Sequence, residues 1–409
     1  MGLTPHQQEK MEALLNAIDS GLNRVVLTGS AGVGKTYLVK TLLEIFDSER
    51  GEIFITAPTH KALAVLKSKI DTADNLEFST IHSALKLKRK FKPDGKVFFK
   101  QEFDSRFPPF ERCKLLIIDE ASMLNEDILG NLKQYHFPIV FIGDEKQINP
   151  VKEENSPVFH QHWFTVELTE IIRQGEGNPI IDLSRNLPLM WHKTSNLTSK
   201  KQGYLFTEDR KKVIEKLAAV NGTDELKYLA WTNEEVDAIN QSVRHLIYGD
   251  NPAMIEQGEI LVLNSPYSGK DKKEYYTNQE IEIGTLSIMN KRCYPPGLAP
   301  FDMKVYYINE SIFAVHENSL NFHKQICKEI KSLANSKQIK WVDYYHYIES
   351  FADFTYNHAI TIHKSQGSTY KDVIVNVENT NRNRDKKEKQ RLFYTAVTRA
   401  SELLILYNV

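Results

Sequence analysis

Residues 29–36 read Gly-Ser-Ala-Gly-Val-Gly-Lys-Thr and directly follow an apolar run, Val25–Leu27. This is the phosphate-binding pattern G-x-x-x-x-G-K-[ST], placed where a strand should turn into a helix. Its glycines let the backbone wrap a polyphosphate, so that successive N–H groups and the helix N-terminus point at it. Lys35 would bring a positive charge to the β and γ phosphates, and the Thr36 hydroxyl would bind Mg²⁺. The pattern predicts a site that binds and hydrolyses ATP.

Two adjacent acids, Asp119 and Glu120, follow the apolar run Leu115–Ile118. Asp119 would hold the Mg²⁺ shell, and Glu120 would orient and deprotonate an attacking water. Acids at strand ends are common, so the pair alone does not indicate catalysis. The phosphate-binding loop earlier in the chain is what favours a catalytic role for the two acids. Gln147 follows the next apolar run, Ile139–Ile142. A neutral amide there could hydrogen-bond the γ-phosphate, and the hydrogen bond would be lost when the phosphate is cleaved. The alternative is that Gln147 lies in a surface turn with no such role.

Two arginines, Arg173 and Arg399, are candidates to stabilise charge on the transferring phosphoryl group. An isolated arginine is usually a solvated surface residue, but both lie in the second half of the chain or at its entry. The second half of the chain could then close over a nucleotide bound to the first half. Such closure would couple ATP hydrolysis to movement along a polymer. Gln7 precedes the first apolar run, and its amide has a donor and an acceptor that match the edge of adenine.

The elements that must position these residues follow an α/β rhythm. Short apolar runs rich in branched residues alternate with helical stretches, as in the buried strands of a parallel sheet. The runs are Val25–Leu27, Ile53–Ile55, Leu115–Ile118 and Ile139–Ile142 in the first half, and Tyr228–Trp231, Ala359–Ile362, Val373–Val377 and Leu403–Leu406 in the second. We therefore predict an α/β fold with two lobes.

Two segments interrupt this rhythm. Residues 86–110 contain Pro-Asp-Gly at 93–95 between extended flanks, which predicts a β-hairpin. Seven Lys or Arg residues and a single acid lie between positions 86 and 100, so the hairpin is strongly basic. Residues 246–350 begin with alternating segments separated by turns, which predict a small antiparallel barrel, and continue into a polar helical stretch.

Composition narrows the class of protein. The chain has 409 residues, of which 41% are hydrophobic and 10% aromatic, favouring two or three packed domains over disorder. Its net charge of −1 gives no global attraction to nucleic acid, so positive charge for such a partner must be gathered locally. Three widely spaced cysteines argue against disulfide and zinc frameworks. Without a signal-like or membrane-spanning segment, we expect a soluble cytoplasmic protein that does not bind membranes.

Ten short motifs resemble those of superfamily 1 DNA helicases, in the same order, and specifically the Dda/RecD branch. They are LTPHQ (3–7), GSAGVGKT (29–36), APTHKA (57–62), STIHSAL (79–85), LLIIDEAS (115–122), GDEKQINPV (143–151), LTEIIRQ (168–174), AWTNEEVDAIN (230–240), AITIHKSQGST (359–369) and LFYTAVTRA (392–400). The likeness spans nearly the whole chain and is patchy within 246–350, where only Tyr276–Glu280 matches. It implies an ATP-dependent DNA helicase that moves 5′→3′ on single-stranded DNA, in replication or recombination.

The resemblance also implies a domain plan with two RecA-like P-loop lobes. The first lobe would comprise 1–85 and 111–172, and the second 173–245 and 351–409. The hairpin at 86–110 would be the pin that splits the duplex. The segment 246–350 would be a Src-homology-3-like barrel with a helical part, which lies over the DNA and braces the pin.

The resemblance further assigns residues to roles. Nucleotide contacts would come from Gln7, Gly29, Ser30, Ala31, Gly32, Val33, Gly34, Lys35, Thr36 and Gly367, with Ser368 beside them. Catalysis would rest on Lys35, Asp119, Glu120, Gln147, Arg173 and Arg399, with Thr36 and Asp119 as Mg²⁺ ligands. Single-stranded DNA would be held by Pro58, Thr59, His60, Thr80 and His82 in the first lobe and by Thr361, His363 and Lys364 in the second.

Phe98 or Phe99 would stack on the last base pair at the junction, with Phe99 preferred. The alternative is that these side chains pack beneath the hairpin. Because neighbouring strand residues face opposite ways, at most one of the two should then be buried.

Two other interpretations stay open at this point. A nucleotide-gated binder that remodels protein–DNA complexes would keep every ATP motif but lack a working pin. A P-loop kinase of a small metabolite would not need the second lobe with its TRA and HKSQG stretches. For the helicase we expect a monomer that binds single-stranded and forked DNA, with a single-strand-binding protein or other replication proteins, in a bacterial or phage-infected cell. Direction of movement and DNA rather than RNA rest on the resemblance alone.

Overall fold

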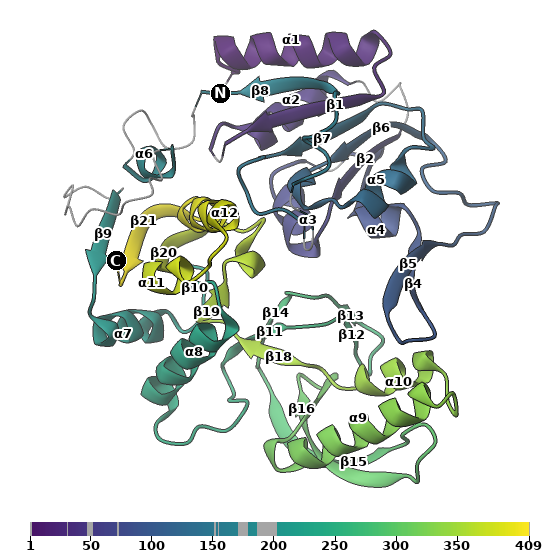
Figure 1. The fold of residues 1–409 in the computed structure, drawn as a ribbon, viewed down its shortest axis with the longest axis vertical. Helices are drawn as coiled ribbons and strands as arrows, with labels where there is room; N and C mark the ends of the chain where they lie inside the picture. Colours follow the sequence, from purple (N-terminus) through teal and green to yellow (C-terminus); the bar gives the residue numbers. More distant parts are fainter. Residues whose placement is uncertain are drawn as a thin grey trace.

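The computed structural model describes residues 2–30, 32–46, 52–71, 73–150, 153, 155–170, 179–185 and 203–408. Two sheets dominate the chain, and every strand pairing within them is parallel (Figure 1). The predicted α/β class and the two-part architecture are therefore confirmed. Within the described ranges, no helix is both long and apolar enough to cross a bilayer.

The first lobe, as we use the term here, is a six-stranded sheet of order β3-β2-β6-β7-β1-β8 with helices α1–α5. Its strands are β1 (Arg24–Gly29), β2 (Glu52–Ala57), β3 (Leu76–Thr80), β6 (Cys113–Ile118), β7 (Ile139–Gly143) and β8 (Phe164–Leu168). Its helices are α1 (Pro5–Asp19), α2 (Lys35–Ile45), α3 (His60–Lys67), α4 (Ile81–Ala84) and α5 (Glu126–Leu132), with a 3-10 turn at Ala121–Met123.

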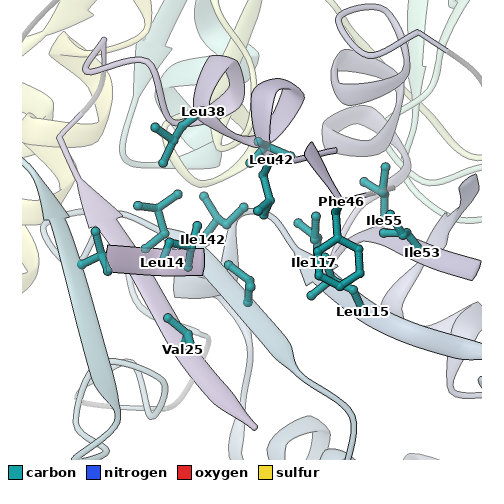
Figure 2. Close-up of a cluster of buried hydrophobic side chains, with 14 of the residues drawn as sticks. Leu14, Val25, Leu38, Leu42, Phe46, Ile53, Ile55, Leu115, Ile117 and Ile142 are labelled. Carbon is teal, nitrogen blue, oxygen red and sulfur yellow. The ribbon is translucent and has the colours of Figure 1, made fainter. Parts of the chain in front are cut away.

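Unbroken apolar runs form this sheet because both of its faces are buried. Successive residues of a strand point to opposite faces, so Val25 and Leu27 join one core while Val26 joins the other. Figure 2 shows the first of these cores, in which helix and strand residues interdigitate. Its labelled members are Leu14, Leu38, Leu42 and Phe46 from the helical side and Val25, Ile53, Ile55, Leu115, Ile117 and Ile142 from the strands. Helix α5 covers the second core.

The second lobe is a five-stranded sheet of order β19-β10-β20-β21-β9 with the helices around it. Its strands are β9 (Gly203–Thr207), β10 (Leu226–Ala230), β19 (Ala359–Thr361), β20 (Tyr370–Asn376) and β21 (Ala400–Tyr407). Its helices are α6 (Pro179–Arg185), α7 (Arg210–Val220), α8 (Asn233–Tyr248), α11 (Val377–Asn381) and α12 (Lys386–Val397), with a 3-10 turn at His363–Ser365. The same alternation holds here, since Val373 and Val375 face one core and Ile374 the other.

Two further pieces emerge from the lobes. In the first lobe, β4 (Leu87–Phe91) and β5 (Val97–Gln101) form an antiparallel hairpin that lies apart from the main sheet (Figure 1). The second piece, which we call the insertion, comprises the elements between α8 and β19. It contains three small antiparallel sheets and two helices.

The strands of the insertion are β11 (Ile260–Leu263), β12 (Tyr267–Ser268), β13 (Glu274–Tyr275), β14 (Glu280–Glu282), β15 (Leu286–Cys293), β16 (Phe301–Ile308), β17 (Ile312–Val315) and β18 (Phe354–Tyr356). Its helices are α9 (Leu320–Asn335) and α10 (Trp341–Ile348), preceded by a 3-10 turn at Glu317–Ser319. Strand β16 serves two cores, because Tyr306 and Ile308 face the strands β11–β14 while Met303 and Val305 face α9 and α10. The insertion is therefore one packed unit that carries α10 toward the β4–β5 hairpin (Figure 1).

Candidate functional site

The glycine-rich loop connects the end of β1 to the start of α2. Gly32 and Gly34 take φ values of 85° and 83°, in the left-handed region where a Cβ would be strained. Lys35 is the first residue of α2, and its Nζ donates to the carbonyls of Gly29 and Ser30 at 2.6 and 3.1 Å. The ammonium group is therefore held over the loop, at the N-terminus of a helix.

A cavity of about 360 Å³ lies at this loop, and both lobes line it. The predicted site residues among its lining are Gly32, Gly34, Lys35, Thr36, Asp119, Glu120, Gln147, Gly367, Ser368 and Arg399. The two lobes approach closely at Gly367, whose φ is 74°. A Cβ on Gly367 would lie 3.2 Å from the Cβ of Ala62 in the first lobe, so glycine permits this approach.

The backbone changes from the strand β6 to a left-handed conformation between Asp119 and Glu120. Asp119 N–H still donates to the Thr56 carbonyl at 2.9 Å, whereas Glu120 has a left-handed φ of 51°. Burial, reinforced by the Glu120 carboxylate, raises the pKa of Asp119 well above its usual range. The Asp119 carboxylate and the Thr36 hydroxyl line the same cavity, and such hard oxygen donors fit Mg²⁺.

Gln147 is buried, and its Oε1 has no hydrogen-bond partner among the described residues. The loop that carries it is tied to the second lobe at two points. The Tyr394 hydroxyl donates to Asp144 Oδ2 at 2.6 Å, and Gln366 Nε2 donates to the Ile148 carbonyl at 3.0 Å. The unpartnered amide oxygen therefore lies beside an interlobe contact.

Arg399 is 4% exposed and follows α12 of the second lobe. Its guanidinium donates to the carbonyls of Thr395 and Ser368 at 3.0 and 2.9 Å, and to Thr398 Oγ1 at 3.3 Å. All these acceptors are neutral, and no ion pair found in the described part of the chain includes Arg399. A buried positive charge without an acid, lining the same cavity as the phosphate-binding loop, fits an anionic ligand.

Four predicted nucleotide contacts that the structure describes do not appear in this lining, namely Gln7, Gly29, Ser30 and Val33. Ala31 and Arg173 lie outside the described residues. Gln7 is buried and forms a capping box at the start of α1, in which its Oε1 accepts from Thr4 N–H and its own N–H donates to Thr4 Oγ1, both at 3.2 Å. The pattern T-x-x-Q before an apolar helix could have signalled this cap. Gln7 Nε2 has no partner among the described residues, so one side of the amide is uncommitted.

A larger cavity of about 640 Å³, which we call the α3 groove, lies between the first lobe and the insertion. His60 and Thr80 are the predicted DNA contacts that line it. Helix α3 separates the two cavities, since Ala62 and Val65 line the nucleotide cavity while Ala64 lines the groove. The groove is also lined by residues that no sequence motif assigned to DNA, namely Lys61, Lys67, Phe78, Tyr276, Asn278, Gln279 and Glu280, and by Asp224 of the second lobe.

The remaining predicted DNA contacts are dispersed. Thr59 and Thr80 are N-caps, accepting from Ala62 and Ser83 N–H, each at 3.2 Å. His363 lines a third cavity of about 520 Å³ between the lobes. Lys364 Nζ donates to Asn264 Oδ1 of the insertion at 2.9 Å, and Thr361 Oγ1 accepts from Lys364 N–H at 3.3 Å. Pro58 is half-buried between β2 and α3.

The β4–β5 hairpin is fixed to α10 of the insertion. Trp341 Nε1 donates to the Pro93 carbonyl at 3.1 Å, and the Tyr345 hydroxyl donates to the Gly95 carbonyl at 3.2 Å. A Cβ on Gly95 would lie 2.6 Å from the Trp341 ring, so glycine is required at this contact. Lower on the hairpin, Arg89 pairs with Glu349 at 2.6 Å. The hairpin tip is thereby braced by a helix from a distant part of the chain.

The two hairpin phenylalanines lie on opposite faces. Phe99 is paired in register with Arg89, on the face that meets α10, and its ring packs edge-on against His82 with centroids 5.1 Å apart. Phe98 is paired with Lys90 on the other face. Phe98 and Phe99 are 36% and 52% exposed, so neither is packed beneath the hairpin.

Comparison with known proteins shows which proteins this chain resembles. A family model of an AAA domain matches residues 2–189, and a model of the UvrD-like helicase C-terminal domain matches residues 356–407. The chain is 29% identical to the ATP-dependent DNA helicase dda of Enterobacteria phage T4, with 97% of each chain aligned. It is 22% identical to the RecBCD enzyme subunit RecD of Buchnera aphidicola, over 98% of this chain and 73% of that protein. The chain is therefore similar over nearly its whole length to superfamily 1 helicases of the Dda/RecD branch.

Solved structures share the fold of this chain. A Pif1 structure concerned with unwinding of forked double-stranded DNA has a TM-score of 0.55 and 19% identity, covering 99% of this chain and 92% of that one. Pif1 from Bacteroides in complex with ADP-AlF3 and single-stranded DNA has a TM-score of 0.53 and 19% identity, covering 100% and 93%. At this identity the likeness shows the two-lobe fold.

Several side-chain contacts join the separate parts of this fold. Tyr394, Gln366, Tyr276 and Trp341 each bridge two of the three pieces, namely the first lobe, the second lobe and the insertion. Local sequence patterns could not identify them, because each contact depends on a partner far along the chain, as in the 218 positions that separate Gln366 from Ile148 and the 250 that separate Tyr394 from Asp144.

Proposed function

We propose that this protein is a helicase that hydrolyses ATP between its lobes, moves 5′→3′ on single-stranded DNA and separates duplex strands at the β4–β5 hairpin. One observation carries the proposal. Lys35, Asp119 and Glu120 of the first lobe and Arg399 of the second line one cavity. A ligand that contacts residues of both lobes couples its own cleavage to the distance between them.

The residues of the cavity divide the chemistry of phosphoryl transfer. The loop N–H groups and Lys35 would bind the β and γ phosphates, and Arg399 would stabilise the charge that develops on the transferred group. Glu120 would orient and deprotonate the attacking water. Thr36 and Asp119 would hold Mg²⁺, which when bound neutralises charge on the phosphates. Gln147, whose Oε1 lacks a partner among the described residues, would contact the γ-phosphate through a water.

Two further nucleotide contacts belong to the proposal. The uncommitted Nε2 of Gln7 would donate to adenine while its Oε1 keeps the helix cap. Arg173 would add a second positive charge from the entry to the second lobe.

The proposal also includes the domain borders. The first RecA-like lobe would comprise 1–85 and 111–172, and the second would comprise 173–245 and 351–409. The pin would be 86–110, and 246–350 would be a Src-homology-3-like barrel with its helical part.

Single-stranded and forked DNA are the proposed polymers. The relative dda is named a DNA helicase, and the Pif1 structures contain single-stranded DNA or concern forked DNA. In this chain, the basic hairpin supplies local positive charge on a molecule whose net charge is −1. Pro58, Thr59, His60, Thr80 and His82 would contact the strand in the first lobe, and Thr361, His363 and Lys364 in the second.

Phe99 is the proposed residue at the fork. Its exposed ring lies beside His82, on the hairpin face that α10 braces. A rigid aromatic side chain can stack on the terminal base pair irrespective of sequence, at about 1–3 kcal/mol per base. Bracing matters because a mobile hairpin would yield to the duplex instead of splitting it.

Unwinding of forked duplexes with a 5′ or a 3′ tail, in DNA and RNA forms, tests the proposal. We expect ATP-dependent separation of the 5′-tailed DNA fork, abolished by Lys35→Ala while some single-strand binding remains. Separation of the 3′-tailed fork alone would mean that the protein moves 3′→5′, opposite to the proposed direction. DNA-stimulated hydrolysis without separation of any fork would indicate a nucleotide-gated binder instead.

A further inference from the structure

The turn Tyr276–Glu280 of the insertion forms one wall of the α3 groove and contacts the opposite wall at two points. The Tyr276 ring stacks on the His60 imidazole, with centroids 3.6 Å apart and planes inclined by 16°. Glu280 Oε1 pairs with Lys61 Nζ at 3.0 Å. Both contacts reach the first turn of α3, so the turn bridges the groove to the first lobe.

Lys61 connects this bridge to the second lobe as well. Its ammonium lies 5.4 Å from the centre of the Tyr370 ring in β20. The Lys61 and Glu280 side chains are 26% and 28% exposed, so the ion pair is partly shielded from water. One ion pair and one ring stack are few enough contacts to open and close again.

The lining of the groove has the composition of a single-strand site. His60, Phe78 and Tyr276 offer ring faces on which bases can stack, and Lys61 and Lys67 offer charge to phosphates. Asn278 and Gln279 add amides that hydrogen-bond base edges or phosphates. The lining also contains two acids, and each lies beside a lysine: Glu280 is paired with Lys61 at 3.0 Å, and Asp224 lies 3.7 Å from the Lys227 ammonium.

We propose that Tyr276 is a base-stacking contact and that the Tyr276–Glu280 turn encloses the strand lying in the α3 groove. A base inserted between His60 and Tyr276 would replace one ring stack by two. Because the turn bridges the groove, the His60–Tyr276 and Lys61–Glu280 contacts must open before a strand without a free end can enter. The inference rests on the proposed function only in placing single-stranded DNA in this groove.

Covalent closure of the bridge tests the enclosure. Lys61→Cys and Glu280→Cys would be combined in a Cys327→Ser background, since Cys113 and Cys293 are buried and Cys327 is partly exposed. A short bismaleimide then joins the two new thiols, and the same variant without cross-linker is the control. The probes are a circular single-stranded DNA and its linear form, both fluorescently labelled.

Two orders of addition give the outcome. When the protein is first loaded on the circle and then cross-linked, we expect it to stay bound through a high-salt wash that removes the control. When it is cross-linked first, we expect loss of binding to the circle. Release from the circle in the first order overturns the enclosure, as does equal binding of circle and linear DNA in the second. An uncross-linked protein that unwinds no fork would instead refute the proposed function.

Substitution at Tyr276 tests the stacking contact. Tyr276→Ala should weaken single-strand binding roughly tenfold, whereas Tyr276→Phe should bind like wild type because the ring face is kept. The matched control is Tyr294→Ala, which removes another exposed aromatic ring of the insertion, 74% exposed, away from the groove lining. Binding of Tyr276→Ala within twofold of Tyr294→Ala would refute the stacking role.

Discussion

Asp144 of the first lobe accepts a hydrogen bond from the Tyr394 hydroxyl of the second lobe, with 2.6 Å between the two oxygens. Both side chains are buried. Asp144 precedes Gln147 in the loop after β7, and Tyr394 lies in α12, whose end leads to Arg399. The hydrogen bond therefore ties together the two loops that carry a proposed γ-phosphate contact and the proposed catalytic arginine.

Tyr394→Phe should weaken this coupling without emptying space in the core. Loss of the hydroxyl leaves a buried carboxylate short of one donor, which should destabilise the protein by about 1–3 kcal/mol and slow DNA-stimulated hydrolysis. Denaturant unfolding and ATPase assays measure the two effects. A double-mutant cycle with Asp144→Asn isolates the pair. Strictly additive effects of the two changes would show that the contact contributes no coupling.

Arg399→Ala should retain ATP affinity and lose most hydrolysis, by about 100-fold or more, because the proposed interaction strengthens in the transition state. Arg399 also holds the Ser368 and Thr395 carbonyls, so thermal unfolding must accompany the kinetics. Arg399→Lys serves as the charge-conserving variant and should recover little, since an ammonium cannot reproduce the planar fork. Turnover near wild type in a folded Arg399→Ala protein would exclude this residue as the catalytic arginine.

Phe99→Ala should impair strand separation while leaving DNA-stimulated ATPase close to wild type. Phe98→Ala is the matched control, because it removes the same ring from the other face of β5. Fork unwinding and ATPase rates on single-stranded DNA separate the two activities. A larger unwinding defect in Phe98→Ala would assign the fork to that residue, and parallel loss of both activities in Phe99→Ala would indicate a folding role.

Because His358 is buried, the free energy of unfolding should decrease as the pH falls into the mildly acidic range. Burial, with help from the charges of Lys227 and Arg244, lowers the pKa of His358 to about 4. The folded state then keeps His358 neutral while the unfolded state, with a pKa near about 6.5, takes up a proton as the pH falls. The contribution of neutral His358 to the free energy of unfolding is therefore fully present above about pH 6.5 and declines as the pH falls toward about 4.

Denaturant unfolding at about pH 7 and about pH 5 measures this effect. His358→Gln, which cannot titrate, should lose about 2 kcal/mol less stability than wild type between these two conditions. Identical losses in both proteins would mean that His358 is protonated in the folded state.

Features written in consecutive residues could be predicted from the sequence. The glycine-rich loop needs left-handed backbone at particular positions, and Gly32 and Gly34 supply it locally. Apolar runs revealed the buried strands, because both faces of a parallel sheet must be covered. The acids at Asp119 and Glu120 were found through the strand that ends beside them.

Relationships between distant residues were decided only by the tertiary structure. Nothing near Tyr276 indicates a stack on His60, and nothing near Trp341 indicates a hydrogen bond to Pro93. Gln7 shows the reverse case, in which a local cap was present in the sequence and was overlooked in favour of a long-range role. Short-range backbone geometry is encoded by each residue and its neighbours, whereas a cavity or a bridge exists only when packing brings separate elements together. The sequence by itself therefore determined the phosphate loop and the sheets, and tertiary packing decided which side chains from the two lobes and the insertion face one another.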